Sequence, residues 1–255
     1  MSRPRILLLG GTAEASALAR RIADDGRLEG ILSLAGATRA PAASPLATRI
    51  GGFGGADGLA RYLGANRIDA LLDATHPFAT GISANARAAA SAAGVPGLAL
   101  LRPPWREAAG ERWVRVPDMT AAAQALGDRP RRVFLTIGRK DLAPFRGTPH
   151  SYVVRSVDPP PPEDLPAGAT AIAARGPFAV DDEERLLERH RIDALVTKNS
   201  GGEATAAKLA AARRRGIPVV MVDRPPALGP AVETVDEVWD WLVARHAGTA
   251  ALRGV

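Results

Sequence analysis

Two glycine-rich segments of this chain carry residues that could bind an anion. The first, Gly10-Gly11-Thr12, follows the apolar run 6–9 and precedes a helix predicted over residues 13–23. Glycines let the backbone turn sharply beside a ligand, and a helix N-terminus directs free N–H groups toward it. The match to the dinucleotide-binding frame G-x-G-x-x-G/A is partial, because Thr12 replaces the second glycine. The alternative is an ordinary strand-to-helix turn without a ligand.

The segment after the second predicted strand indicates which nucleotide would bind. An NAD site places Asp or Glu at the end of that strand, where it binds the ribose 2′-hydroxyl. The strand predicted over residues 31–34 is followed by small residues, Thr38 and Arg39, with no carboxylate. A guanidinium pairs with a phosphate in a forked geometry, so the segment favours NADP over NAD. A solvated loop arginine is the alternative for Arg39.

The second glycine-rich segment ends another predicted strand and combines a cation with several hydrogen-bond donors. Lys198 is one of three lysines in the chain, and Asn199, Ser200, Gly201 and Gly202 follow it. Such donors at the start of a predicted helix form an anion cradle. The segment is not a Walker loop, because its lysine precedes the glycines. We expect a functional site here in preference to a purely structural turn.

Three further side chains stand where predicted strands end, the edge at which open α/β sheets bind ligands. His76, within residues 73–78, could donate a proton or contact a carboxylate, or it could simply fill a turn before a helix. Arg102 and Arg139 each follow a predicted strand and suggest anion sites. Trp105, close to Arg102, offers a stacking surface or, equally, a core residue.

Composition narrows the function classes. The net charge is +6 and the pI about 10.6, but the basic residues are scattered and no aromatic platform accompanies them. This pattern disfavours nucleic acid and leaves a polyanionic small molecule, or a simple arginine bias, as the explanation. With no cysteine, disulfides, thiolate metal sites and cysteine nucleophiles are excluded, and we predict no metal site. No secretory segment or long apolar stretch is evident, so we expect a cytoplasmic protein without membrane contact.

Strand-like and helix-like segments alternate along the chain, which predicts an α/β fold with mainly parallel sheets. We expect two Rossmann-like domains, over residues 1–120 and 121–255, with a cleft between them that holds the site. The proline-rich run 158–162 is expected to be a stiff, exposed connector.

Taken together, these motifs resemble the precorrin-6A reductase family of cobalamin biosynthesis and its cobalt-precorrin-6A counterparts. The resemblance extends over nearly the whole chain, apart from the proline-rich stretch 158–166 and the tail after residue 246. The matching segments, in chain order, are Leu9–Ala15, Gly51–Gly55, Asp73–Ala79, Arg102–Trp105, Ile137–Arg139, Thr197–Gly202, Ile217–Val219 and Arg224-Pro225.

The resemblance implies hydride transfer from NADPH to the macrocycle of precorrin-6A, which gives precorrin-6B after protonation of the neighbouring carbon. The polycarboxylate tetrapyrrole would explain the basic surface, and neighbouring enzymes of the pathway are candidate partners. The first domain would bind NADPH and the second would face the substrate. The implied roles are cofactor binding for Gly10, Gly11, Thr12, Thr38 and Arg39, substrate binding for Asn199, Ser200, Gly201, Gly202, Arg139 and Arg102, and catalysis for Lys198 or His76.

Three points stay open at this stage. Solvent is a third candidate for the proton donor, beside Lys198 and His76. The family would lead us to expect arginine at Ala37, so recognition of a 2′-phosphate is expected to depend on Arg39. The alternative functions are NADPH-dependent reduction of another anionic substrate and a dinucleotide-binding sensor without catalysis.

Overall fold

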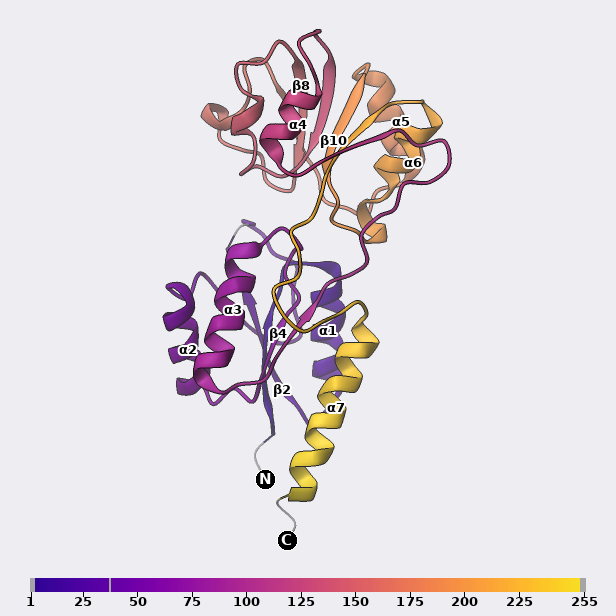
Figure 1. The fold of residues 1–255 in the computed structure, drawn as a ribbon. Coiled ribbons are helices and arrows are strands. Elements are labelled where there is room, and N and C mark those ends of the chain that lie inside the picture. The colour runs from indigo at the N-terminus through magenta and orange to yellow at the C-terminus, as the bar shows by residue number, and fades with distance from the viewer. Residues whose placement is uncertain (1–2, 37, 253–255) are drawn as a thin grey trace. The chain divides into compact units, whose positions relative to one another are not determined.

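The chain forms two compact units, shown in Figure 1 as a computed structural model that describes residues 3–36 and 38–252. The first unit comprises Met1–Pro103 and Pro225–Val255, and the second comprises Pro104–Arg224. Ala37, at which the family resemblance suggested arginine, lies outside the described residues.

The first unit contains a six-stranded sheet with the order β3-β2-β1-β4-β5-β12, in which all neighbouring strands are parallel. This is the strand order of a Rossmann fold, and it reverses direction between β1 and β4. Helices α1 and α7 cover one face of the sheet, and α2 and α3 cover the other. The bounds are β1 Arg5–Leu9, α1 Ala13–Asp24, β2 Glu29–Leu34, β3 Ala47–Ile50, α2 Gly55–Ala65, β4 Ala70–Asp73, α3 Thr80–Ala93, β5 Gly97–Leu100, β12 Ala231–Val232 and α7 Val235–Leu252.

The continuous apolar run 6–9, which ends at Gly10, predicts a strand that is buried on both faces, and β1 is such a strand. Ile6 and Leu8 are buried with α1 and α7, whereas Leu7 and Leu9 are buried with α2 and α3. Alternate side chains of a strand point to opposite faces, so a strand covered on both faces needs apolar residues at every position.

The second unit repeats this architecture, with the strand order β6-β11-β10-β7-β8-β9 and parallel pairing throughout. Its strand order reverses between β7 and β10. The bounds are β6 Trp113–Val116, α4 Met119–Ala125, β7 Arg132–Thr136, η1 Ala143–Phe145, β8 Ser151–Ser156, η2 Pro162–Asp164, β9 Thr170–Ala173, α5 Val180–Arg189, β10 Ala194–Lys198, η3 Glu203–Thr205, α6 Ala207–Arg214 and β11 Val219–Val222.

A buried ion pair joins β8 to α5 in this unit. Arg155 donates to both carboxylate oxygens of Glu183, and its guanidinium lies 3.8 Å from the ring centre of Phe178. Both charged side chains are almost completely buried. Because a buried charge without its partner is costly, this pair fixes one arrangement of strand and helix.

The prediction of two α/β domains with parallel sheets is confirmed, but the structure divides the chain differently from the predicted boundary at residue 120. Residues 104–120 belong to the second unit, because β6 pairs with β11. Residues 225–255 return to the first unit, where β12 extends the edge at β5 and α7 buries Val238 and Leu242 against the core. In each unit, one edge strand (β12 or β6) therefore pairs with a strand that is distant from it in sequence. The expected cleft between the domains stays a prediction.

Helix α3 also begins later than expected. The sequence predicts a helix over residues 78–93 with Pro77 at its first turn, because proline suits that position, but α3 begins at Thr80. Residues 76–79 form a separate turn, in which the His76 carbonyl accepts a hydrogen bond from the Ala79 N–H.

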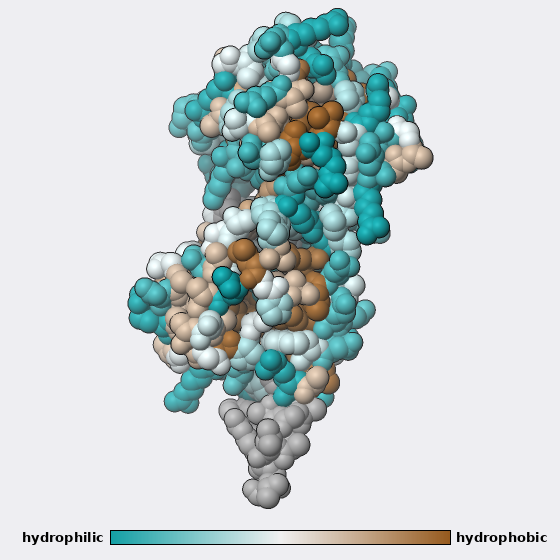
Figure 2. All heavy atoms as spheres, viewed as in Figure 1, coloured by the Kyte–Doolittle hydropathy of each residue, from teal (hydrophilic) through white to brown (hydrophobic). Residues whose placement is uncertain are grey.

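The surface drawn in Figure 2 is mostly hydrophilic over the second unit, and apolar residues occur there in small groups. None of the helices in the described part of the chain is long and apolar enough to cross a membrane.

Candidate functional site

Thr12 joins the two strands between which the first sheet reverses its order. Its Oγ1 donates to the Ala74 carbonyl at 2.8 Å, just beyond β4, and accepts from the Ala15 N–H at 3.1 Å as the N-cap of α1. Ligands of open α/β sheets bind at the carboxyl edge, beside this reversal. The predicted residue Thr12 therefore lies at the expected position and holds the turn that precedes α1.

Gly10 and Gly11 have different physical reasons to be glycine. A Cβ at Gly10 would meet Leu32 Cδ1 at 2.5 Å, whereas Gly11 has φ +119° and open space where a Cβ would lie. The first glycine allows close packing against β2, and the second allows a backbone conformation that other residues rarely adopt.

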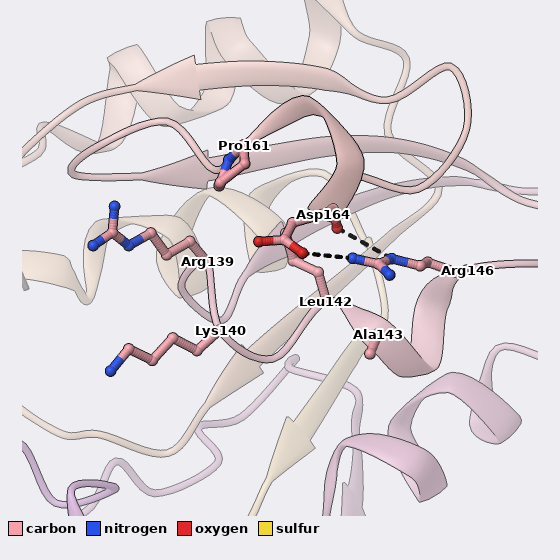
Figure 3. Close-up of a pocket in the computed structure, with 7 residues that line it drawn as sticks. All are labelled: Arg139, Lys140, Leu142, Ala143, Arg146, Pro161 and Asp164. Atoms are coloured by element: carbon pink, nitrogen blue, oxygen red, sulfur yellow. Dashed lines mark hydrogen bonds and ion pairs between the residues drawn. The ribbon is translucent and has the colours of Figure 1, made fainter.

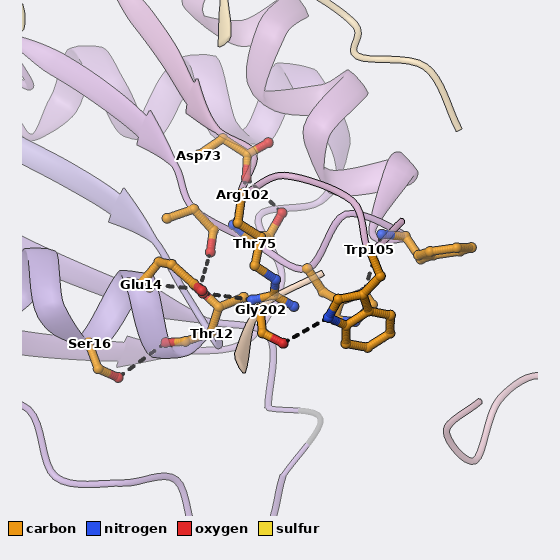
Figure 4. A network of polar contacts seen from close by, with 12 residues as sticks. Thr12, Glu14, Ser16, Asp73, Thr75, Arg102, Trp105 and Gly202 are labelled. Atoms are coloured by element: carbon orange, nitrogen blue, oxygen red, sulfur yellow. Dashed lines mark hydrogen bonds and ion pairs between the residues drawn. The ribbon is translucent and has the colours of Figure 1, made fainter. Parts of the chain in front are cut away.

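Arg102 follows β5 and pairs with Glu14 in the first turn of α1, as Figure 4 shows. The Nη1–Oε2 distance is 2.6 Å, and the two side chains are 14% and 24% exposed. The contact places Arg102 beside the glycine-rich turn, where its charge offsets a carboxylate that would otherwise repel a bound phosphate. Arg102 thus lies close to the start of α1, and its predicted contact with substrate stays a prediction.

Thr38 and Arg39 lie in the segment after β2, at the carboxyl edge of the same sheet, where Arg39 is exposed. Strand β2 pairs with the edge strand β3, which carries Arg49. The sequence analysis did not single out Arg49. Arg49 donates to Ser33 Oγ at 2.8 Å and to the carbonyls of Gly51 and Gly52 at 2.9 and 3.0 Å. It therefore holds the glycine-rich loop that begins at Gly51.

His76 lies in the turn after β4, where its Nδ1 accepts a hydrogen bond from the Phe78 N–H at 3.2 Å. The neutral ring consequently carries its proton on Nε2, the nitrogen that could donate to a ligand. Asp73 Oδ1 accepts from both the N–H and the hydroxyl of Thr75, at 3.1 and 2.6 Å. These two residues stabilise the turn before His76 and do not cap α3.

Lys198 lies at the point where the second sheet reverses its strand order, as Thr12 does in the first sheet. It ends β10, and its Nζ donates to Asp141 Oδ2 at 2.5 Å in the loop after β7. The lysine side chain is 16% exposed and the aspartate side chain 37% exposed. The ammonium group of Lys198 is thereby held at the carboxyl edge of the second sheet.

Asn199 contacts the backbone of Trp105, and its predicted contact with substrate stays a prediction. Its side chain is buried, accepts from the Trp105 N–H at 2.8 Å and donates to the Trp105 carbonyl at 3.1 Å. Both functional groups of the amide are thus engaged by the protein's own backbone. Asn199 positions residue 105, and the indole Nε1 of Trp105 donates to the Gly202 carbonyl at 3.0 Å, as Figure 4 shows.

The remaining residues of this segment form its backbone turn. Gly201 and Gly202 adopt φ +66° and +83°, and the Ser200 N–H donates to the Lys198 carbonyl at 2.8 Å. Trp105 also packs against the apolar core of the unit, with the Lys208 ammonium 4.4 Å from its ring centre. Trp105 is thus partly buried and packs against the core, while its alternative role as a stacking surface stays a prediction.

Arg139 lines a pocket of about 570 Å³ on the second unit, drawn in Figure 3. It lies with Lys140 in the loop between β7 and η1. Lys198, Asp141 and Arg139 thus come from adjoining segments at one edge of this sheet. Within the part of the chain that the structure describes, no cluster of three or more metal-binding side chains occurs.

Sequence reasoning missed Asp141, Glu14 and Arg49. Asp141 and Glu14 are carboxylates one or two residues beyond a predicted anion motif, and that proximity could have marked them as partners for a cation. Arg49 gave no such signal, because the short strand that carries it was not predicted.

Comparison with known proteins supplies a family. Residues 5–243 match the family model described as "Precorrin-6x reductase CbiJ/CobK". A precorrin-6A reductase of Sinorhizobium sp. is 53% identical over 249 residues, covering 95% of each chain. A precorrin-6A reductase of Rhodococcus erythropolis is 52% identical, covering 92% of this chain and 94% of that protein. A solved structure named "CobK precorrin-6A reductase" superposes with a TM-score of 0.90 at 47% identity, covering 94% of this chain and 96% of that one.

Proposed function

Because this chain belongs to the precorrin-6x reductase CbiJ/CobK family, we propose that it is an NADPH-dependent oxidoreductase that reduces precorrin-6A to precorrin-6B in cobalamin biosynthesis. The observation that carries the proposal is the near full-length match to precorrin-6A reductases, together with a glycine-rich turn at the reversal point of a Rossmann sheet. NADPH, when bound, would supply the hydride.

The first unit offers the groups that a dinucleotide requires. The turn at Gly10, Gly11 and Thr12 would hold the pyrophosphate at the N-terminus of α1, with Arg102 offsetting Glu14. Thr38 and Arg39 lie where a 2′-phosphate would be recognised, and no carboxylate follows β2 to favour NAD.

The second unit offers cations for a polycarboxylate macrocycle. Arg139 would bind a carboxylate, and the backbone of Ser200, Gly201 and Gly202 would line the carboxyl edge beside Lys198. Lys198 and His76 are the proposed proton donors, with solvent as the third source. The protein's contribution is then to hold the reactants in place and exclude water, since the cofactor carries the hydride chemistry. A cytoplasmic location and contact with neighbouring pathway enzymes stay predictions.

The decisive experiment is anaerobic incubation of the purified protein with precorrin-6A and NADPH, with the absorbance of both followed together. Stoichiometric loss of NADPH and conversion of the tetrapyrrole are expected. NADPH binding without oxidation would instead identify a dinucleotide-binding sensor. Turnover of a different anionic acceptor, with precorrin-6A inert, would identify another reductase.

Cofactor choice is tested by Arg39→Ala, with the exposed Arg20→Ala on α1 as the matched control. Loss of a charge-assisted contact to the 2′-phosphate should raise KM for NADPH by about tenfold or more and leave KM for NADH nearly unchanged. Equal changes for both nucleotides would contradict the role of Arg39.

A further inference from the structure

The pocket on the second unit is built from the loops that follow two neighbouring strands, β7 and β8. Its volume is about 570 Å³. One wall comes from the loop after β7 and the other from the proline-rich connector after β8. The lining residues are Arg139, Lys140, Leu142, Ala143, Arg146, Pro161 and Asp164. Because β7 and β8 are parallel, these loops meet at the carboxyl edge of the sheet, where α/β folds bind ligands.

The charge of the lining favours an anion. Arg139, Lys140 and Arg146 contribute three cations, and Asp164 contributes the one carboxylate. Arg146 is engaged with Asp164, since its Nη2 lies 2.9 Å from Oδ1 and its Nε lies 3.3 Å from the carbonyl oxygen. In Figure 3, Arg139 and Lys140 extend together in one direction, away from that ion pair. The pocket therefore carries two cations, Arg139 and Lys140, on a different side from the Arg146–Asp164 ion pair.

The Arg146–Asp164 pair also explains how the proline-rich wall is held. Residues 159–162 are four consecutive prolines, which have restricted φ angles and no N–H group. Asp164 ends the short helix η2 immediately after them, and Arg146 ties this helix to the loop after η1. On this wall Pro161 has no N–H group and the Asp164 N–H donates to the Pro161 carbonyl, so the wall offers an anion no free backbone donor.

One residue, Asp141, connects the lining of the pocket to Lys198. Asp141, which accepts the hydrogen bond from Lys198, lies in the chain between Lys140 and Leu142, both of which line the pocket. A molecule at the carboxyl edge beside Lys198 could place a side chain here.

We propose that this pocket is a binding subsite for a carboxylate side chain of the tetrapyrrole, contacted by Arg139 and Lys140, and that Arg146 and Asp164 position its wall. The inference rests on the proposed function and extends it, because it assigns a place on the second unit to one of the substrate's acidic side chains.

The main test is the double variant Arg139→Gln/Lys140→Gln in the full-length protein. Its control, Arg129→Gln/Arg189→Gln, removes the same charge from exposed positions of the second unit that do not line the pocket. The pocket variant should raise KM for precorrin-6A by about tenfold or more, while KM for NADPH stays unchanged. The control should leave both values unchanged. Equal KM values for precorrin-6A in the two variants would overturn the assignment.

A second measurement separates charge from structure and does not require turnover. The probe is uroporphyrin, a tetrapyrrole polycarboxylate, titrated without nucleotide and followed by its fluorescence. The charge-conserving variant Arg139→Lys/Lys140→Arg should bind it nearly as the wild type does, and the Gln variant should bind about tenfold more weakly. Equal affinity of the wild type and the Gln variant would contradict the subsite.

The two proposals can fail separately. If the wild type does not reduce precorrin-6A but the Gln variant loses uroporphyrin binding, the proposed function is wrong and an anion subsite remains. If the wild type reduces precorrin-6A and neither the KM nor the probe affinity of the pocket variant differs from those of the control, the subsite alone is wrong.

Discussion

Lys198 and Asp141 form an ion pair across the line at which the second sheet reverses its strand order. They are 57 residues apart in sequence and reach each other because β10 and β7 are neighbouring parallel strands. In the first sheet, Thr12 and the Ala74 carbonyl make the corresponding link between the segments after β1 and β4. Each unit is thus bridged by a polar contact at the position where its fold would bind a ligand.

Removing the charge of Lys198 should impair catalysis more than removing its partner. We expect Lys198→Gln to lower kcat/KM for precorrin-6A by about tenfold or more, and Asp141→Asn to have a smaller effect because an acceptor oxygen remains. The double variant should resemble Lys198→Gln, since residues of one network are not additive. Steady-state kinetics of the four proteins would measure this. The control variant is Asp182→Asn, which removes one partner of the exposed Arg185–Asp182 pair and should leave kcat/KM for precorrin-6A unchanged.

Two substitutions of Thr12 should distinguish the contribution of its hydroxyl group from that of its branched shape. Thr12→Val keeps the branched side chain but loses the bond to Ala74 and the N-cap bond from Ala15, at a cost of about 1–2 kcal/mol in stability. Thr12→Ser should retain both bonds. We expect the valine variant to weaken NADPH binding about tenfold and the serine variant to bind almost normally, as measured by isothermal titration. Equal weakening in both variants would show that the two hydrogen bonds of the hydroxyl do not decide the affinity for NADPH.

Two glycines of α2 should respond to alanine with opposite signs. A Cβ at Gly58 would lie 1.7 Å from the Phe53 carbonyl oxygen, so Gly58→Ala must displace the loop that Arg49 holds. Gly64 has nothing within 4 Å of its Cβ position. Gly64→Ala should therefore stabilise the protein by up to about 1 kcal/mol, and Gly58→Ala should destabilise it by more than about 2 kcal/mol. Thermal denaturation distinguishes these outcomes, and a stable Gly58→Ala protein would show that the loop moves freely.

His150 should make stability depend on pH. Burial lowers the pKa of this imidazole below its ordinary value of 6.5 and outweighs the opposing effect of the nearby Gly127 carbonyl. The unfolded chain then binds a proton that the folded protein excludes, so stability falls as the pH drops below 6.5 toward the folded pKa. The free energy of unfolding should therefore be lower at pH 5.5 than at pH 7.

The variant His150→Phe tests this dependence. A phenyl ring has no titrating group and can retain the edge-on contact with Tyr152, in which the ring centres are 6.1 Å apart. Chemical denaturation across this pH range should give a flatter profile for the variant than for the wild type. Parallel profiles would assign the pH dependence to other groups.

Much of the fold was predictable because its signals are local. The run Ile6–Leu9 bounded by glycines indicated a strand covered on both faces, and Thr12 marked the start of the following helix, as found. Strand β3 was missed because Ala47–Ile50 is mostly exposed and lacks an apolar pattern. Strand β12, only two residues long, is specified by its pairing with β5 and by no local signal.

The sequence predicted at which edge of each sheet the candidate residues lie better than it predicted which contacts they make. Strand ends marked Gly10, Lys198 and Arg139, because the carboxyl edge is set by topology. The use of Asn199 to hold the Trp105 backbone could not be inferred, since the two residues are 94 positions apart. The position of Asp141 next to a predicted anion motif was a usable signal, but its pairing with Lys198 is known only once β7 and β10 are neighbours.

The return of residues 225–255 to the first unit has a consequence for biosynthesis. When the first 103 residues have emerged from the ribosome, β5 still lacks its partner β12. The face of the sheet that will pack against Val238 and Leu242 is then still uncovered. The middle of the chain carries every strand of its own sheet and can complete that sheet during translation. The unit whose synthesis starts first is therefore the last to acquire its full core, only after the C-terminal segment has emerged.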